Sequence, residues 1–244
     1  MRVLIVGGTS AIASETAKRF AREGAHLFLT GRNTERLAAV ADDLRVRGAA
    51  RVDTAVLDVA DIASHRRVIE SAVATLGGLD VALVAHGSLP DQRRCQEVVN
   101  EALEALHLNF TATIALLTLL ANKLESQRSG CLAVITSVAG DRGRASNYVY
   151  GAAKGGVQIF LQGLRARLLR ANVAVVTIKP GFVDTPMTAG FKKNALFADA
   201  GRVGRGIHSA IKRRSDVVYL PWFWRPVMTV LASLPERVFK RLHL

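Results

Sequence analysis

The chain has 244 residues, half of them hydrophobic, which is enough to bury the core of one α/β domain, and no linker divides it. The formal net charge of +13 suggests nucleic acid, but no long basic run, zinc finger or aromatic RNA-binding motif accompanies it. Two distant cysteines, Cys95 and Cys131, offer neither a disulfide framework nor a metal site. We therefore expect a globular cytoplasmic protein that holds no metal and binds no nucleic acid.

The first stretch predicts a strand, a tight turn and a helix. The apolar run Val3–Val6 follows Met1-Arg2 directly, so it is interpreted as a buried strand and not as a signal peptide. An amphipathic helix is expected from Ala11 to Arg22. Such a turn directs backbone amides and a helix N-terminus at a phosphate; the alternative is an ordinary strand-to-helix turn. The residues expected to hold a dinucleotide here are Gly7, Thr9, Ser10, Ala11 and Ile12.

The second strand, His26–Thr30, is followed by Gly31, Arg32 and Asn33, and then by a helix from about Thr34 to Arg47. A carboxylate after this strand would bind an adenosine ribose, whereas Arg32 offers a charged fork to a 2′-phosphate. The position therefore favours NADP(H) over NAD(H), with Arg32 and Asn33 as contacts. A solvated surface arginine is the alternative.

The third strand, Val52–Leu57, ends at Asp58 and Val59. Asp58 could accept a hydrogen bond from the adenine amino group while Val59 packs on the ring, or Asp58 could be a loop or helix-capping residue. A helix is expected from Asp61 to Leu76, where Gly77-Gly78 ends it.

The fourth strand, Val81–Val84, leads into Ala85, His86 and Gly87, small residues apart from the histidine. They would let a cofactor pass over the strand end. His86 has no paired carboxylate in the pattern, so we expect it to hold position and not to transfer protons.

A long helical region is expected from Asp91 to Gln127, broken near Glu97–Glu101. No uninterrupted apolar stretch in it reaches the length of a membrane-spanning helix. Asn109 interrupts its apolar stripe, and a buried amide at this position must be hydrogen-bonded.

The fifth strand, Cys131–Ile135, ends near Ser137, and the next helix, from about Ser146 to Arg170, carries Tyr150 and Lys154. Four-residue spacing puts the phenol and the ammonium on one helix face, where the cation is expected to lower the pKa of the phenol. Ser137 and Tyr150 would then hold a carbonyl oxygen.

The sixth strand, Val173–Ile178, precedes a turn at the same sheet edge. The turn residues expected to meet the cofactor are Pro180, Gly181, Val183 and Thr185. A helix from Val203 to Arg213 and a strand Val217–Leu220 complete a catalytic domain over residues 1–220.

Residues 221–244 predict an amphipathic helical tail in which Trp222 and Trp224 stand beside Arg225. Clustered tryptophans and arginines are typical of interfacial membrane anchors, but also of protein interfaces. Peripheral contact with a membrane and packing on a second subunit therefore both stay open.

These motifs, in this order, resemble the short-chain dehydrogenase/reductase family over nearly the whole chain. Val6–Ala13 looks like the family's glycine-rich turn, Val84–Gly87 like its N-x-A-G element, and Pro180–Thr185 matches P-G-x-V-x-T. The resemblance implies a Rossmann-type doubly wound parallel sheet of order 3-2-1-4-5-6-7 with helices on both faces, and a homodimer or homotetramer. It also implies a catalytic tetrad of Asn109, Ser137, Tyr150 and Lys154.

In that tetrad Tyr150 would donate the proton, Ser137 would hold the carbonyl, Lys154 would bind the nicotinamide ribose and lower the tyrosine pKa, and Asn109 would keep a water in place. The chain departs from the pattern at Val6, Ala11 and Ala13 of the first turn and at Val84, where the family has asparagine. These changes put cofactor affinity in doubt more than the chemistry.

The tail and the first turn are similar to the branch of decaprenylphosphoryl-2-ketoribose reductases. This implies an NADPH-dependent reductase of a keto-sugar on a polyprenyl phosphate, at the inner face of the membrane, with a flavin-dependent partner oxidase. The segment Met187–Ala200, apolar and basic, would cover such an amphiphile. A soluble 3-ketoacyl or small-carbonyl reductase is the alternative, and a non-catalytic dinucleotide-sensing regulator is an alternative of another class.

Overall fold

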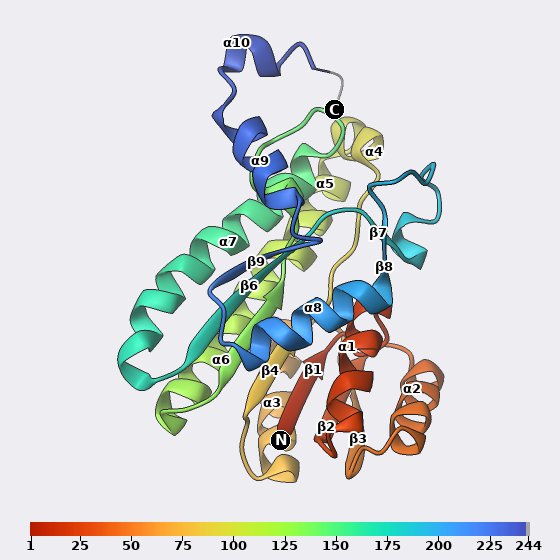
Figure 1. Cartoon of the computed structure of the whole chain (residues 1–244), viewed down its shortest axis with the longest axis vertical. Coiled ribbons are helices and arrows are strands. Elements are labelled where there is room, and N and C mark those ends of the chain that lie inside the picture. The colour runs from red at the N-terminus through yellow and green to blue at the C-terminus, as the bar shows by residue number, and fades with distance from the viewer. Residues whose placement is uncertain (243–244) are drawn as a thin grey trace.

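The computed structural model describes residues 1–242, which form a seven-stranded parallel sheet flanked by helices (Figure 1). Its strands are β1 (Arg2–Val6), β2 (His26–Gly31), β3 (Arg51–Val56), β4 (Val81–Val84), β5 (Cys131–Ile135), β6 (Ala174–Pro180) and β9 (Val217–Leu220). Their order is β3-β2-β1-β4-β5-β6-β9. The predicted order is confirmed, because the short strands β7 (Val183–Asp184) and β8 (Ala198–Asp199) pair only with each other.

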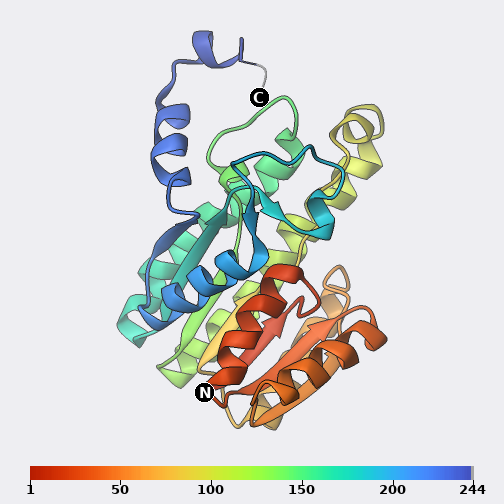
Figure 2. The ribbon, with the colours of Figure 1, turned by 45° about the vertical axis from the view of Figure 1, so that its right-hand side comes forward.

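Helices cover both faces of the sheet, as predicted (Figures 1 and 2). One face holds α1 (Ala11–Arg22), α2 (Thr34–Val46) and α8 (Ala200–Lys212), and the other holds α3 (Ile62–Leu76), α6 (Ala112–Gln127) and α7 (Tyr148–Leu168). The central strands β1, β4 and β5 are buried between these layers and almost wholly apolar, whereas the edge strand β3 has exposed residues.

The long helical region after β4 breaks where the sequence predicts it. It consists of α4 (Gln92–Glu97), α5 (Val99–Leu106), a π-helical turn (His107–Thr111) and α6. Val98, between α4 and α5, has extended backbone angles.

By length and composition the stretch Val99–Gln127 could cross a membrane, contrary to our expectation that no stretch could. Its Leu116, Leu117, Leu120 and Leu124 are fully buried in the core cluster with α3 and α7, so we assign it to the core. A core helix passes the same test of length and composition.

The carboxyl ends of the strands meet at one edge of the sheet, the upper edge in Figure 1. The strand order reverses between β1 and β4, which are hydrogen-bonded neighbours. Ligands of open α/β sheets bind at such a switch point, outside the carboxyl ends. The segments around α4, β7–β8 and the tail gather at this same end in both views (Figures 1 and 2).

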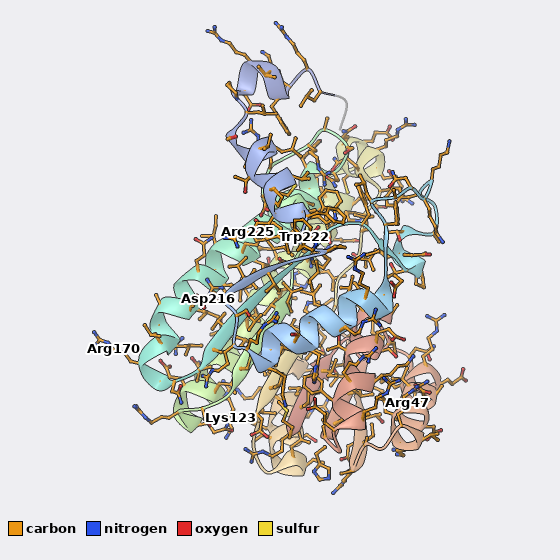
Figure 3. The ribbon with its side chains drawn as sticks, viewed as in Figure 1. Arg47, Lys123, Arg170, Asp216, Trp222 and Arg225 are labelled. Atoms are coloured by element: carbon orange, nitrogen blue, oxygen red, sulfur yellow. The ribbon has the colours of Figure 1, made fainter. Side chains whose placement is uncertain are left out.

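The tail forms α9 (Trp224–Ser233) and α10 (Glu236–Phe239), which confirms its helical prediction. Trp224 and Met228 are buried in a small cluster with Val138, while Trp222 is 72% exposed (Figure 3). Arg142 ties the tail to the loop after β5, since it donates to the Ala232 carbonyl at 2.9 Å and to Glu236 at 2.7 Å. The tail is therefore docked on the body by its inward face.

Trp224 lies so close to Gly181 that a side chain there cannot be accommodated. A Cβ on Gly181 would stand 1.9 Å from Trp224 Nε1. We expect Gly181→Ala to lower the unfolding free energy by about 1–3 kcal/mol, as overpacked sites do, and to shift tryptophan emission to the red as Trp224 leaves its pocket. Denaturant titration followed by fluorescence measures both.

Gly163→Ala on α7 is the matched control, because nothing lies within 4 Å of that Cβ. Alanine is the better helix former, so this change should raise stability by roughly 0.5–1 kcal/mol and leave the emission unchanged. An unaltered spectrum and stability in Gly181→Ala would mean that Trp224 is not docked there.

Candidate active site

A cavity of about 920 Å³ opens at the carboxyl ends of the strands. It is formed by the loops after β1, β4, β5 and β6 together with the segment around Phe191 and Phe197. The predicted site residues that line it are Ser10, Ile12, Ala85, His86, Gly87, Ser137, Tyr150, Lys154, Pro180, Gly181, Val183 and Thr185. The fold thus brings catalytic and cofactor candidates from separate loops into one space.

Ser137, Tyr150 and Lys154 occupy neighbouring positions in this cavity. Ser137 follows β5, and Gln158 Nε2 donates to its carbonyl at 2.7 Å, which holds the loop against α7. The Ser137 hydroxyl lies near enough to the Tyr150 phenol to lower its pKa in part. Lys154 Nζ lies 5.6 Å from the centroid of the Tyr150 ring, one helical turn away. A carbonyl oxygen between the two hydroxyls would meet two hydrogen-bonding groups.

The expected lowering of the Tyr150 pKa is wrong, because the pKa of this phenol is raised. Burial raises the pKa of Tyr150 to about 12, and the Ser137 hydroxyl opposes this only in part. The reason is that loss of hydration disfavours phenolate, and the Lys154 ammonium, 5.6 Å from the ring centroid, does not offset this. Tyr150 is therefore a neutral phenol at pH 7, the form that a proton donor requires.

Lys154 is 5% exposed, and burial lowers its pKa to about 8. Since no carboxylate contributes to this shift, the ammonium keeps most of its charge at neutral pH without a counter-ion. Gly87 makes room for it, because a Cβ there would be 3.1 Å from Lys154 Nζ and 3.0 Å from Asn109 Oδ1.

Asn109 is completely buried in the π-helical turn, behind the cavity wall. Its Nδ2 donates to the Ala105 carbonyl at 3.0 Å, and its Oδ1 accepts from the Ser88 amide at 3.1 Å. The amide is hydrogen-bonded as predicted, and it fixes the loop that passes beside Lys154. Its assignment to a bound water stays a prediction.

His86 is neutral in this setting. Burial, followed by the charges of Lys154 and His65, lowers its pKa to about 3. Thr113 Oγ1 donates to the Leu108 carbonyl at 3.2 Å, so at 2.9 Å it accepts the proton of His86 Nε2. Nδ1 is then an unprotonated acceptor. These features suit a positioning role better than proton transfer.

The turn after β1 has the features of a phosphate cradle. Gly7 has φ of +83°, and a Cβ there would come within 2.8 Å of the His86 amide nitrogen, so only glycine fits. Ser10 occupies the N-cap position of α1 without a side-chain capping bond, and the first turn of α1 carries no acid. A hydroxyl and a helix N-terminus thus face the cavity, as a dinucleotide pyrophosphate would require.

The other cofactor candidates lie beyond the cavity. Gly7, Thr9 and Ala11 lie in the turn itself, and Arg32 is exposed after β2. Asn33 caps α2 by accepting from the Arg36 amide at 2.8 Å. Asp58 accepts from the Ala60 amide at 3.0 Å, while Val59 is 6% exposed and packs in the core. Their contacts with a cofactor stay predictions.

The sequence did not identify several residues that line the cavity, which are Asp91, Gln92, Arg144, Asn147 and Phe182. The position of Arg144 between Ser137 and Tyr150 was the one signal that pointed to it. Asp141, in the same loop, was also missed. It accepts from Lys179 at 2.6 Å and from Tyr219 at 2.8 Å, which ties the loop to β6 and β9.

Comparison with known proteins agrees with this site. The profile of the family described as short chain dehydrogenase matches residues 1–195, and the chain belongs to that family. It is an NAD(P)-dependent oxidoreductase. An uncharacterized oxidoreductase of Mycobacterium tuberculosis is 38% identical over 240 residues, covering 98% of this chain and 96% of the relative. One from Streptomyces coelicolor is 33% identical over 241 residues, covering 98% and 95%.

Solved structures share the fold. The actinorhodin polyketide ketoreductase with NADPH superposes with a TM-score of 0.80 at 20% identity, covering 90% of this chain and 95% of that one. An alcohol dehydrogenase from Thermococcus sibiricus complexed with 5-hydroxy-NADP gives the same values.

Proposed function

We propose that the chain is an NADPH-dependent ketoreductase that acts on an amphiphilic carbonyl compound. The observation that carries the proposal is the grouping of a neutral Tyr150 phenol, the Ser137 hydroxyl and the Lys154 ammonium in one cavity. The aromatic side chains of Phe182, Phe191 and Phe197 line the same space and would contact an apolar chain.

When bound, NADPH would supply a hydride to the carbonyl carbon. Ser137 would hold the carbonyl oxygen, and Tyr150 would donate its phenolic proton to that oxygen, so that the ketone becomes an alcohol. Lys154, charged and desolvated, would stabilise the phenolate that is left behind. Ser10 and Ile12 would hold the phosphates at the α1 terminus, and Lys154 would also hold the nicotinamide ribose.

Tyr150→Phe tests this assignment directly. It removes the only proton donated to the substrate, so we expect carbonyl reduction to fall by about 10²–10⁴-fold while NADPH binding is nearly unchanged. NADPH absorbance with a panel of ketones measures turnover, and NADPH fluorescence measures binding.

Tyr148→Phe is the matched control, since Tyr148 begins the same helix but is 44% exposed. It should retain full activity. Undiminished reduction by Tyr150→Phe would overturn the mechanism, and NADPH binding by a wild-type protein that reduces no carbonyl would favour the dinucleotide-sensing regulator.

Arg32 supports the choice of NADP(H). It follows the last residue of β2, and a Cβ on neighbouring Gly31 would lie 3.6 Å from the Thr9 side chain, so this strand end borders the phosphate turn. A guanidinium there suits a 2′-phosphate. The two structural neighbours named above were solved with NADPH and with an NADP derivative.

We expect Arg32→Ala to weaken NADPH binding by roughly 10- to 100-fold and to leave NADH binding almost unchanged, because only NADPH carries the 2′-phosphate. Dissociation constants from cofactor fluorescence provide the measurement. Arg22→Ala, exposed at the far end of α1, should alter neither. Equal losses for the two cofactors in Arg32→Ala would place the 2′-phosphate elsewhere.

The substrate proposal extends to a lipid-linked ketone, such as a keto-sugar on a polyprenyl phosphate, made by a flavin-dependent oxidase and reduced at the inner face of the membrane. The outward side of the tail supports it: Trp222 is 72% exposed and Val230 60%. The basic residues Arg225, Arg237, Lys240 and Arg241 are exposed in the same tail. Apolar groups among cations suit an anionic membrane surface.

Trp222→Ala should reduce co-sedimentation with vesicles of anionic phospholipid by roughly 10-fold, since about 1.5–3 kcal/mol of apolar burial is lost. Leu169→Ala is the control, because Leu169 is 75% exposed but lies on the opposite end of α7 from the tail. A wild-type chain that stays in solution, or an equal loss in the control, would contradict membrane contact and favour the soluble 3-ketoacyl or small-carbonyl reductase.

Pairing of two or four copies is also proposed. The helices near Asn109 and Tyr150 expose large apolar side chains, including Val99 (71%), Leu103 (56%) and Ile159 (70%). Such residues on α5 and α7 fit an interface between identical chains.

A further inference from the structure

Arg144 is an arginine without a counter-ion in the wall of the cavity. It belongs to the loop between β5 and α7, between Ser137 and Tyr150 in the chain. Its Nε is buried and has no hydrogen-bond partner among residues 1–242. Burial lowers its pKa, and no carboxylate offsets that effect. A guanidinium nitrogen buried in this way is unfavourable until something accepts its hydrogen bond.

The other arginine of this loop shows that partners are within the chain's reach. Arg142 donates to Glu236 at 2.7 Å and to the Ala232 carbonyl at 2.9 Å, and its guanidinium lies 4.3 Å from the centroid of the Phe239 ring. The nearby carboxylate of Asp141 is taken by Lys179 and Tyr219. The charged side chains of Asp141 and Arg142 in this loop are therefore paired, whereas Arg144, which lines the cavity, has no ion-pair partner among residues 1–242.

The charged residues around the cavity are mostly basic. Arg93, Arg144, Lys154 and Lys192 line it, and the single acidic residue is Asp91. Asp91 Oδ1 already accepts from the Arg93 amide at 2.8 Å and the Arg94 amide at 3.3 Å, as the N-cap of α4. No protein group in the described wall is thus arranged to neutralise Arg144, and the cavity attracts anions.

Two further unsatisfied groups line the same cavity as Arg144. Gln92 is 9% exposed, its Oε1 accepts from the Val149 amide at 3.1 Å, and its Nε2 has no partner. Asn147, three residues after Arg144, has an unpartnered buried Oδ1. The amide orientation of Gln92 is set by the bond to Val149, so its free group is a donor.

We propose that Arg144 binds an oxyanion of the carbonyl substrate, a carboxylate or a phosphate, with the Gln92 amide as a second donor. This rests on the proposed reductase function and names its substrate class: a ketone that carries a negative charge. The planar fork of arginine matches both oxyanions with two parallel hydrogen bonds. Asn147 Oδ1 accepts from a hydroxyl group of the same substrate.

Matched probe pairs test the proposal: methyl keto acids of increasing chain length against their methyl esters, and dihydroxyacetone phosphate against dihydroxyacetone. For wild type we expect the charged member of at least one pair to have the lower KM. Arg144→Gln should raise that KM roughly 10- to 100-fold and leave the neutral member unchanged, because a charge-assisted bidentate contact is lost. Whichever pair responds identifies carboxylate or phosphate.

Two variants keep the test sharp. Arg144→Lys retains the charge without the fork and should recover part of the affinity, whereas a folding defect would affect charged and neutral probes alike. Arg93→Gln removes an exposed cation from the same cavity and should change KM less than threefold, since exposed charges are screened. Equal effects on charged and neutral probes, or an Arg93→Gln loss as large as that of Arg144→Gln, would overturn the proposal.

Binding without turnover separates this inference from the proposed function. Calorimetric titration with octanoate should show binding that weakens roughly 10- to 100-fold in Arg144→Gln, while octanol binding is unaffected. If the wild type reduces no ketone but octanoate binding depends on Arg144, the reductase proposal fails and the anion site stands. If ketones are reduced but octanoate binds equally well to wild type and Arg144→Gln, the anion-site proposal is wrong and the reductase proposal stands.

Discussion

The rest of the site depends on the burial of Tyr150 and Lys154 on one face of α7. Packing α7 against β5 and β6 removes both polar groups from water, which favours the neutral phenol and weakens the charge of the ammonium. These two effects act together. The phenol keeps its proton at neutral pH, and the buried ammonium of Lys154 would be stabilised by a negative charge that develops nearby. Small residues such as Gly87 are needed because no larger side chain leaves room for Lys154.

Much of the architecture was predictable because several strands are short apolar runs, such as Val3–Val6, which precedes Gly7, and Val81–Val84. Parallel order then brings the loops after β1, β4, β5 and β6 to one edge, so the catalytic candidates that the family resemblance implies were expected to lie near one another. The direction of the Tyr150 pKa shift could not be predicted, because it depends on how deeply the folded chain buries the phenol. Spacing gives only the shared helix face.

Arg144 was missed for a related reason. In a chain of 33 basic and 20 acidic residues, the sequence does not say which arginine finds a carboxylate. Only the fold shows that Glu236, 94 positions away, pairs with Arg142, and that Asp141 pairs with Lys179. Asn33 and Asp58 were expected to contact a cofactor, but in the fold one side-chain oxygen of each accepts a hydrogen bond from a nearby backbone amide. Side-chain partnerships over long sequence distances are set by tertiary packing.

One loop connects the reacting groups, the unpaired cation and the C-terminal tail. Asp141 fastens it to β6 and β9 through Lys179 and Tyr219, and Arg142 fastens it to α9 and α10. Arg144 and Asn147 follow within the same few residues and lead into the helix of Tyr150. The bonds of Asp141 and Arg142 and the packing of Val138 with Trp224 hold the part of the loop just before Arg144. The tail therefore packs against the loop that carries Arg144, although no tail residue in the described part of the chain lines the cavity.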